Sequence, residues 1–489
     1  MAFFLKKLLE NFTVYGTRTA YVIEGVGYTY ADLGSRVATF QKKVFEFDGE
    51  HYFGVVTRNS IDTYAAIYAI WLSGKTFVPL GATVPSERIL NIVSQVGINV
   101  VFDAGNDPLP LENVVVHHQQ PTIGEQPIYL EVGEDTDVYL LFTSGSTGTP
   151  KGVRISRNNL DSYLRTISKL DYCLTPDDRC LQVYDLTFDG SVQSYLFPLL
   201  FGASVYTVPQ DGIKYLAITK AIIEHQITFL KMTPSVLYYL MPYLDRLIFP
   251  SVRWSVFGGE ALMVPLVEKW QKCVPNAEIQ NVYGPTETTV NCSMYRCKKD
   301  GIHKERNGIL SLGSAYEGTL ALVFDGDRVV SNGEVGELCI SGPQVTKGYW
   351  KNEQLNNCVF FDYPVDGVSY RFYRTGDYVV KDDEGDLFFV GRNDSQVQLN
   401  GYRVELGELE YHTSQFADAQ CVAFIHEDVL NVGNLYLFVE SVKFTQEEII
   451  DNLKSKIPGY MLPHQVIFIE RMPLLPSGKV DRQKLLSLI

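Results

Sequence analysis

Short runs of β-branched and aromatic residues alternate with longer amphipathic stretches over the first 300 residues of the chain. This rhythm predicts an α/β fold with largely parallel sheets, because parallel strands are usually joined through helices. The predicted strands cover residues 51–56, 98–103, 138–143, 204–209, 227–232 and 254–259. The predicted helices between them include residues 63–74 and 216–226.

The pattern changes after residue 300, where closely spaced Gly, Asp and Asn separate short strand-like runs. Such turns are typical of antiparallel hairpins. The last part of the chain has strands and helices of its own, and a turn signal near residues 392–394 separates the two patterns. We therefore expect a large N-terminal α/β domain of packed sheets and helices with a β-rich subdomain, residues 1–393. A small α+β C-terminal domain, residues 394–489, follows it.

The charge of the chain excludes some classes of partner. Its 489 residues include 42 basic and 57 acidic side chains, for a net charge of −15. This balance argues against a surface for nucleic acid or anionic membrane, since the non-specific interaction would be repulsive. The eight cysteines are scattered, and no second pair accompanies Cys292 and Cys297 to complete a zinc site. We expect a cytoplasmic monomer with reduced cysteines.

The N-terminus begins with MAFFLKKLLENF. Two lysines interrupt its apolar run, which is too short and too charged for a signal peptide. We interpret it as a docked amphipathic helix, with attachment to a membrane as the alternative. No run of 18 apolar residues occurs in the sequence, so no membrane insertion is expected. The apolar face of this helix consists of Phe4, Leu5, Leu8, Leu9 and Phe12.

The stretch LLFTSGSTGTPKGV near residue 140 combines a strand end with three glycines, several hydroxyls and a lysine. Glycines let backbone amides approach an anion closely, while hydroxyls add donors and Lys151 adds a positive charge. The segment is chemically a phosphate cradle, although it is not a Walker loop, since Pro150 precedes the lysine and no Ser or Thr follows. Taken alone, it could equally be a structural turn. A helix should follow from Asn158.

Six further motifs follow SGSTGTPKG along the chain. They are FDGS (188–191), NVYGPTETT (281–289), GELCISGPQVTKGYW (336–350), YRTGD (373–377), GRNDSQVQLNGYRVELGELE (391–410) and LPSGKVDR (475–482). With them, essentially the whole chain resembles the adenylate-forming enzymes, which include acyl-CoA synthetases, luciferases and the adenylation domains of nonribosomal peptide synthetases. The resemblance implies a ligase that joins an acid to AMP and then to a thiol.

The resemblance also implies ATP and Mg²⁺ as cofactors. Thr286 matches a phosphate-contacting hydroxyl, Glu287 the magnesium-binding glutamate, and Lys479 the lysine that bridges the acid and the adenylate oxygens. Asp377 matches the residue that grips both ribose hydroxyls, and Tyr283 offers an aromatic face to adenine. The implied nucleotide-binding residues are Thr143, Ser144, Gly145, Ser146, Thr147, Gly148, Lys151, Gly259, Glu260, Asn281, Tyr283, Gly284, Asp377 and Arg392.

The FDGS motif indicates which class of carboxylic acid is the substrate. Asp189 matches the aspartate that pairs with the α-ammonium of an amino acid, although an aspartate there could also be a helix cap. A buried ammonium needs such a partner, because burying it unpaired costs several kcal/mol. The resemblance implies that the acid is bound by Phe188, Asp189, Gly190, Gln193, Lys231, Val256, Gly258, Val282, Val290 and Asn291.

Lys231 is the one cation in this set, and its role stays open at this point. It could pair with an acidic or amide side chain of the substrate, or lie across the site with Gln193 and leave room for glycine or alanine. It could also extend to solvent and select nothing. We favour a small or small-polar amino acid as the substrate: glycine, alanine, or an amino acid similar to Asp or Asn.

Three functions compete on the sequence. The first is an amino-acid adenylating ligase, similar to D-alanine–carrier-protein ligases, that loads the phosphopantetheine thiol of a separate carrier protein in trans. The second is an acyl- or aryl-CoA ligase, for which Asp189 is the main obstacle. The third is a catalytically silent relative, which would not need Lys151, Glu287, Asp377 and Lys479 together.

Overall fold

The structure is a computed structural model that describes residues 2–105, 107–109, 111, 114–116, 121–145, 148–209, 212–299, 301–392, 394, 396–427, 433–441, 443–474 and 480–489. The chain divides into two compact units. Unit 1 comprises Met1–Ala82, Val96–Leu141 and Gly152–Asn393, and unit 2 comprises Thr83–Gln95, Phe142–Lys151 and Asp394–Ile489. The predicted domains, 1–393 and 394–489, stay a prediction, and unit 2 differs from them by including two earlier segments.

The larger sheet of unit 1 contains nine described strands in the order β17-β14-β13-β12-β11-β9-β10-β1-β2. The strands from β1 to β13 in this order pair in parallel, as predicted, and antiparallel strands flank them. Their bounds are β1 Thr19–Ile23, β2 Val26–Thr29, β9 Arg179–Gln182, β10 Ser204–Thr207, β11 Phe229–Met232, β12 Trp254–Gly258, β13 Glu278–Tyr283, β14 Ser293–Arg296 and β17 Ser314–Ala315.

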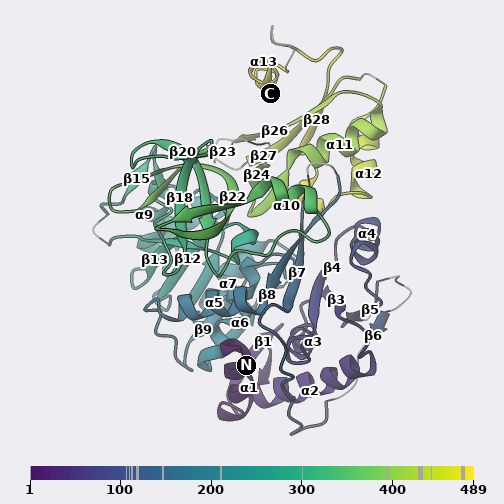
Figure 1. The fold of residues 1–489 in the computed structure, drawn as a ribbon, viewed down its shortest axis with the longest axis vertical. Helices are drawn as coiled ribbons and strands as arrows, with labels where there is room; N and C mark the ends of the chain where they lie inside the picture. Colours follow the sequence, from purple (N-terminus) through teal and green to yellow (C-terminus); the bar gives the residue numbers. More distant parts are fainter. Residues whose placement is uncertain are drawn as a thin grey trace. The chain divides into compact units, whose positions relative to one another are not determined.

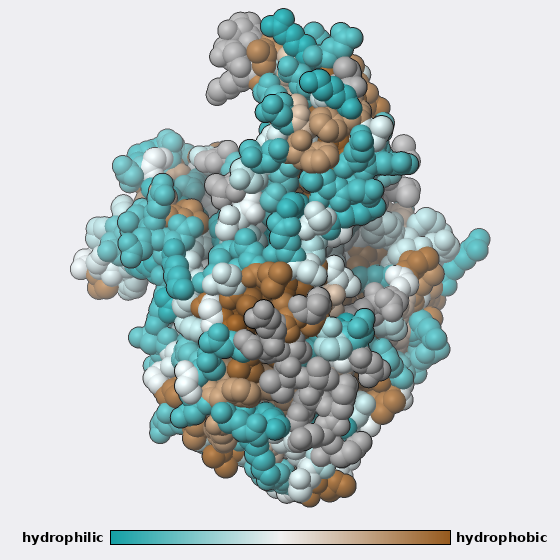
Figure 2. All heavy atoms as spheres, turned by 90° about the vertical axis from the view of Figure 1, so that its right-hand side faces the viewer, coloured by the Kyte–Doolittle hydropathy of each residue, from teal (hydrophilic) through white to brown (hydrophobic). Residues whose placement is uncertain are grey.

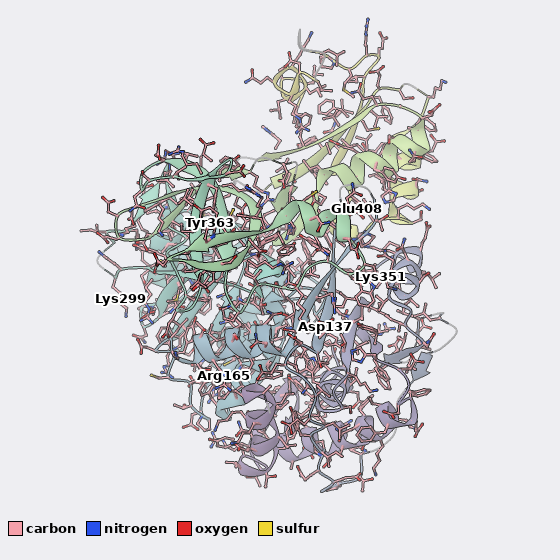
Figure 3. All side chains as sticks on the ribbon, viewed as in Figure 1. Asp137, Arg165, Lys299, Lys351, Tyr363 and Glu408 are labelled. Atoms are coloured by element: carbon pink, nitrogen blue, oxygen red, sulfur yellow. The ribbon has the colours of Figure 1, made fainter. Side chains whose placement is uncertain are left out.

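A second sheet has the order β6-β5-β3-β4-β7-β8. The pairs among β3, β4, β5, β6 and β7 are parallel. Figure 3 labels Asp137 on β7, where its Oδ2 accepts a hydrogen bond of 2.9 Å from Arg154 Nε on β8. The bounds are β3 Tyr52–Thr57, β4 Thr76–Gly81, β5 Val100–Asp103, β6 Val114–Val116, β7 Asp137–Thr143 and β8 Lys151–Ser156.

Helices supply the crossovers and the core of unit 1. The N-terminal helices α1, α2 and α3 lie side by side (Figure 1). Their bounds and those of the other helices are α1 Phe3–Val14, α2 Tyr30–Glu46, α3 Ile61–Leu72, α5 Arg157–Ser168, α6 Gly190–Leu196, α7 Lys214–His225, α8 Pro234–Leu240, α9 Val264–Cys273 and α10 Glu353–Val359. Single 3-10 turns are η1 Pro198–Phe201, η2 Met241–Arg246 and η3 Thr286–Thr288.

The predicted docking of the N-terminal helix is confirmed. Phe4, Leu5, Leu8 and Phe12 are fully buried in a core cluster that also contains Trp71, while Leu9 is only partly buried at its edge. Among the described residues, no helix has the length and apolarity to cross a bilayer. Hydrophilic residues cover much of the face shown in Figure 2, with apolar patches between them.

The β-rich region after residue 300 is antiparallel, as predicted. Its sheet has the order β19-β18-β20-β22-β21, with β23 paired to β22. The bounds are β18 Leu320–Asp325, β19 Arg328–Val329, β20 Val335–Ser341, β21 Phe360–Val365, β22 Val368–Lys381 and β23 Leu387–Arg392, and a separate small hairpin pairs β15 Glu305–Arg306 with β16 Ile309–Leu310.

Unit 2 combines a hairpin and a three-stranded sheet with helices on its own core, an α+β arrangement. Its strands are β24 Gln396–Leu399, β25 Tyr402–Glu405, β26 Cys421–Glu427, β27 Gly433–Val439 and β28 Gln465–Phe468. Its helices are α4 Ser86–Val96, α11 Leu406–Ala417, η4 Gly459–Met461, α12 Gln446–Lys454 and α13 Arg482–Leu486.

Candidate active site

Neighbouring parallel strands carry several of the predicted acid-binding residues. Lys231 on β11 is in register with Val256 on β12, and Gly258 at the end of β12 is in register with Val282 on β13. A Cβ on Gly258 would lie 2.8 Å from Val282 Cγ2, so only glycine allows this close approach of the two strands. Ligands of open α/β sheets bind outside the carboxyl ends of the strands, and this register places the predicted residues at that edge.

A network of buried polar side chains surrounds the Lys231 ammonium, and we call it the Lys231 network: Lys231, Gln193, Asn291, Tyr163 and Tyr316. Lys231 Nζ donates to Gln193 Oε1 at 2.6 Å and to Asn291 Oδ1 at 3.4 Å. Tyr163 Oη lies 2.9 Å from each of the same two oxygens. Asn291 Nδ2 donates in turn to the hydroxyl of Tyr316.

Lys231 is therefore held inside the protein. It is only 3% exposed, which rules out the interpretation that its ammonium extends to solvent. Burial lowers the pKa of Lys231, and the negative charge of Asp189 acts in the opposite direction. Of the two remaining interpretations, the bond to Gln193 favours a lysine that lies across the site.

Asp189 precedes helix α6 but does not cap it, since its side chain makes no capping hydrogen bond. Its Oδ2 is buried and has no hydrogen-bond partner among the described residues. Burial raises the pKa of Asp189, whereas Lys231 and Thr286 act to lower it. An acceptor in this state is suited to receive a cationic donor.

The side chain of Tyr184 lies near both Lys231 and Asp189. A Cβ on Gly190, the residue after Asp189, would lie 3.3 Å from the Tyr184 ring, and Lys231 Nζ lies 6.0 Å from the centre of that ring. The half-buried Phe188 lies in the turn that leads into α6. Tyr184 was missed in the sequence because it lies outside FDGS and was indistinguishable there from a core tyrosine.

The turn after YGPTE is strained. Thr289 has φ of 59° and Val290 has φ of 71°, a left-handed conformation that β-branched residues rarely adopt. Such strain persists where the surroundings fix it, and it concentrates at functional sites. Here Gln344 fixes the turn, since its carbonyl oxygen accepts from Thr289 Oγ1 at 2.6 Å and its Nε2 donates to the Asn291 carbonyl oxygen at 3.0 Å.

Glu287 lies on η3 just before this turn and is fully buried. Its Oε1 accepts a hydrogen bond of 2.6 Å from the hydroxyl of Tyr349. Thr286 beside it is half-buried. Tyr349 was not predicted as a site residue, although it stands in the GELCISGPQVTKGYW motif.

Asp377 on β22 joins two other predicted nucleotide-binding residues. Tyr283 Oη donates to its Oδ2 at 2.6 Å, and Arg392 Nη1 donates to its Oδ1 at 2.5 Å. The pairing of β22 with β23 sets Asp377 opposite Arg392. Burial raises the pKa of Tyr283, and the neighbouring Asp377 charge raises it further. Both oxygens of this carboxylate therefore already face donors.

The glycines at adenine's predicted position differ in packing, and two polar side chains there are already hydrogen-bonded. A Cβ on Gly284 would lie 2.4 Å from Asn291 Cα, and Gly259 has φ of 86°. Glu260 Oε2 accepts from the backbone N–H of Ser235 at 2.7 Å. Asn281 donates through Nδ2 to the Ser311 carbonyl oxygen at 2.9 Å, so one of its amide hydrogens is already bonded.

The predicted phosphate loop belongs to unit 2, where its donors face acidic side chains of the VELGELE segment. Lys151 Nζ lies 3.1 Å from Glu405 Oε1, and the backbone N–H of Gly145 donates to Glu408 Oε2 at 3.2 Å. Figure 3 labels Glu408, which lies on α11 and is fully buried. Arg88 Nη1 donates to the other oxygen of this carboxylate. Two donors that were predicted to bind phosphate, Lys151 Nζ and the Gly145 N–H, thus contact carboxylates of the protein.

Ser144, Thr143 and Gly148 make further contacts within unit 2. Ser144 Oγ lies 3.1 Å from the Arg403 carbonyl oxygen, and Thr143 Oγ1 lies 3.4 Å from the Lys151 carbonyl oxygen. Gly148 has φ of 77°, and a Cβ there would lie 2.5 Å from the ring of Tyr411. Three predicted residues, Ser146, Thr147 and Lys479, lie outside the described residues.

A family model described as AMP-binding enzyme matches residues 8–350, which is more than half of the 489 residues. The chain belongs to this family. This AMP-binding enzyme is 30% identical over 433 residues to the D-alanine–D-alanyl carrier protein ligase of Bacillus licheniformis, and the match covers 84% of each chain. It is 29% identical over 482 residues to tyrocidine synthase 3 of Brevibacillus parabrevis, with 95% of this chain covered.

The AMP-binding enzyme spans only part of such synthases, since the match covers 7% of tyrocidine synthase 3 and 44% of tyrocidine synthase 1. Among solved structures, the adenylation domain AlmE of Vibrio cholerae, in complex with glycyl-adenosine-5′-phosphate, is 26% identical with a TM-score of 0.86. That match covers 100% of this chain and 98% of AlmE. The o-succinylbenzoate CoA synthetase of Bacillus subtilis shares the fold, with a TM-score of 0.83 at 20% identity.

These comparisons confirm the predicted resemblance and fold class. The AMP-binding enzyme is a ligase of the adenylate-forming type, and enzymes of this family use ATP. Because a CoA synthetase shares the same fold, the fold leaves the choice of acid and thiol to the residues of the site.

Proposed function

We propose that this AMP-binding enzyme activates an amino acid with ATP and transfers the aminoacyl group to a carrier-protein thiol. In the first step an oxygen of the amino-acid carboxylate attacks the α-phosphorus of ATP, and the bond to the departing pyrophosphate breaks. In the second step the thiol sulfur bonds to the acyl carbon as the bond to AMP breaks, and the thiol proton passes to solvent.

One observation carries the choice of an amino acid, namely the buried Oδ2 of Asp189 without a partner among the described residues. A carboxylate left in this condition is unfavourable until a donor reaches it. The α-ammonium of an amino acid supplies both the hydrogen bond and the charge. A fatty or aromatic acid would bring no donor to Asp189 Oδ2, which disfavours the acyl- or aryl-CoA ligase.

The nucleotide part of the proposal depends on Asp377, Arg392 and Tyr283. A carboxylate can accept from both ribose hydroxyls, and the 2.5 Å ion pair with Arg392 holds Asp377 in a fixed position for this role. By the family resemblance alone, Lys151 would contribute positive charge toward the phosphates, and Lys479 would contact the acid and adenylate oxygens. Thr286 contributes a phosphate-contacting hydroxyl.

Glu287 would hold Mg²⁺ in this proposal. A hard carboxylate oxygen fits this ion, which commonly binds through one or two carboxylates together with substrate phosphates and waters. When bound, the ion would neutralise charge that builds on the phosphates. Tyr349 orients the carboxylate through its 2.6 Å hydrogen bond to Oε1.

The Lys231 network supports a small substrate. Lys231 is already bonded to Gln193 and lies close to Asn291, so a long side chain would have to break these contacts. We therefore propose glycine or alanine as the substrate in preference to an amino acid similar to Asp or Asn. The glycyl-adenylate bound to AlmE, a relative that this chain covers almost completely, supports the same order.

A separate carrier protein is the proposed acceptor. The name of the carrier protein ligase that matches over 84% of each chain supports this partner. Asp394 and Gly401, which match the family's hinge and the glycine bordering its thiol channel, are the residues we assign to the second step.

Amino-acid-dependent exchange of labelled pyrophosphate into ATP tests the proposal. We expect exchange with glycine, D-alanine or L-alanine, and none with benzoate or hexanoate. Replacement of Asp189 by Asn should abolish most of the exchange while the protein stays folded. Exchange with the simple acids and not with any amino acid would overturn the proposal in favour of the CoA ligase.

A further inference from the structure

Tyr163 lies at the centre of the Lys231 network, although it belongs to none of the motifs that identify the family. It projects from α5, whose start is fixed by a capping box between Ser156 and Asn159. Its side chain is fully buried. The helix therefore delivers a phenol hydroxyl to residues that lie 30 and 128 positions further along the chain.

The orientation of the two amides follows from the chemistry of their neighbours. An ammonium group only donates, so Gln193 and Asn291 must turn their oxygens toward Lys231. Burial raises the pKa of Tyr163, which keeps its hydroxyl protonated as a second donor. Lys231 and Tyr163 thus both face the two carbonyl oxygens. The Tyr163 hydroxyl donates its single proton to one of these oxygens at a time, and the Tyr316 hydroxyl accepts from Asn291 Nδ2.

We propose that Tyr163 is a positioning residue for acid specificity. Its hydroxyl holds Gln193 and Asn291 against Lys231 and so closes the network against amino acids with larger side chains. This inference rests on the proposed function, because it concerns the acid that is adenylated. It extends the set of specificity residues beyond the positions that the family motifs indicate.

The Tyr163 hydroxyl limits the rotational freedom of the Gln193 amide. Gln193 Nε2 is buried with no hydrogen-bond partner among the described residues, so the hydrogen bonds that orient this amide are those of its oxygen. Without the Tyr163 hydroxyl, only Lys231 would hold this oxygen. The amide could then rotate, and Lys231 could move with it, so a larger side chain could enter without breaking a rigid set of bonds.

The test compares Tyr163→Phe with Tyr195→Phe. Both variants keep the ring and remove one buried hydroxyl, but the Tyr195 hydroxyl has no hydrogen-bond partner among the described residues. The readout is a selectivity ratio, defined as kcat/KM of pyrophosphate exchange for L-valine divided by that for the preferred small amino acid. We expect the ratio to rise by about fivefold or more in Tyr163→Phe and to stay unchanged in Tyr195→Phe. The change should arise mainly in KM.

A double-mutant cycle with Lys231→Met separates positioning from general loosening. If Tyr163 acts through Lys231, then Tyr163→Phe should add little to the selectivity ratio when Lys231 is already replaced. A ratio unchanged in Tyr163→Phe, or an equal rise in Tyr195→Phe, would overturn the inference. If Tyr163→Phe fails to fold, Tyr316→Phe is tested in its place with the same expectations. Absence of exchange with every amino acid in the wild-type enzyme would instead contradict the proposed function.

Discussion

At the scale of single residues, Asp189 is a buried carboxylate whose Oδ2 has no hydrogen-bond partner among the described residues. Its pKa is raised by burial, whereas Lys231 and Thr286 act to lower it and Glu287 to raise it. The sequence motif indicated the position of this carboxylate, but not that Oδ2 would lack a partner. That property depends on side chains from several elements, which only the folded chain brings together.

The pH dependence of amino-acid binding tests this carboxylate. Because the folded pKa of Asp189 is raised, protonation removes its charge at a higher pH than for an exposed aspartate. The protonated form cannot pair with the ammonium, so KM for the amino acid should rise as pH falls between about pH 8 and pH 5. Kinetics of pyrophosphate exchange across this range measure the effect.

The matched controls are Asp189→Asn and Asp185→Asn. The first should have a high KM that no longer changes across the acid range. The second removes a carboxylate that accepts hydrogen bonds from its own turn, at Thr187, and should keep the wild-type pH profile. A wild-type profile in Asp189→Asn would show that another group titrates.

Motifs gave the identity of many candidate residues but not their contacts. The Asp377–Arg392–Tyr283 group could be predicted because each member stands in a family motif. Tyr163 and Tyr316 could not, since a tyrosine on an amphipathic helix or near a strand is usually a core residue. Their role depends on where amides from distant segments meet.

At the scale of elements, the β7–β8 connection makes contacts that the sequence did not indicate, and its predicted phosphate binding stays a prediction. The glycines, hydroxyls and lysine predict an anion site there, and the structure has anions at it, but they are Glu405 and Glu408 of the protein itself. The sequence shows the ELGELE segment plainly. The two segments that make this contact lie more than 250 residues apart in the sequence, so no local pattern reveals it.

Replacement of Glu405 should improve the affinity for ATP. The Glu405→Gln variant loses the charge that pairs with Lys151 at 3.1 Å, so, if Lys151 binds the ATP phosphates as proposed, less interaction has to be broken on binding. We expect KM for ATP to fall by about twofold to tenfold, which corresponds to a charge pair of roughly 0.5–1.4 kcal/mol. Initial-rate exchange kinetics at varied ATP measure it.

Glu447→Gln provides the control, because Glu447 is an exposed carboxylate in the first turn of α12. It changes net charge by the same amount and should leave KM for ATP unaltered. An unchanged or higher KM for ATP in Glu405→Gln would mean that the glutamate does not compete with the nucleotide.

At the scale of the whole molecule, hydrophobic periodicity was sufficient to predict the α/β class and the antiparallel region after residue 300. Period and turn residues specify element type, and the rules for parallel connections then limit the topology. The order of the nine described strands could not be predicted in this way. It depends on which faces pack together, and many crossovers satisfy the same pattern.

Helix α1 contributes to the stability of unit 1 through a few large side chains. Leu8 is fully buried in the core cluster, so Leu8→Ala should lower the free energy of unfolding by about 2–5 kcal/mol. Val14 at the end of the same helix is 68% exposed, and Val14→Ala should change it by about 0.5 kcal/mol or less. Urea denaturation followed by tryptophan fluorescence compares the two, and equal effects would mean that α1 is not docked.

The acidic side chains at the phosphate loop have a consequence for inhibitors. Because Glu405 belongs to the same chain as Lys151, it competes with a ligand for this lysine at an effective concentration on the order of millimolar, and dilution of the protein does not change that concentration. If Lys151 binds phosphate as proposed, compounds whose polyphosphate reaches this lysine must displace the Glu405 carboxylate, whereas compounds that stop at the first phosphorus need not. Mimics of the adenylate should therefore outperform mimics of the triphosphate by more than their own contacts would suggest.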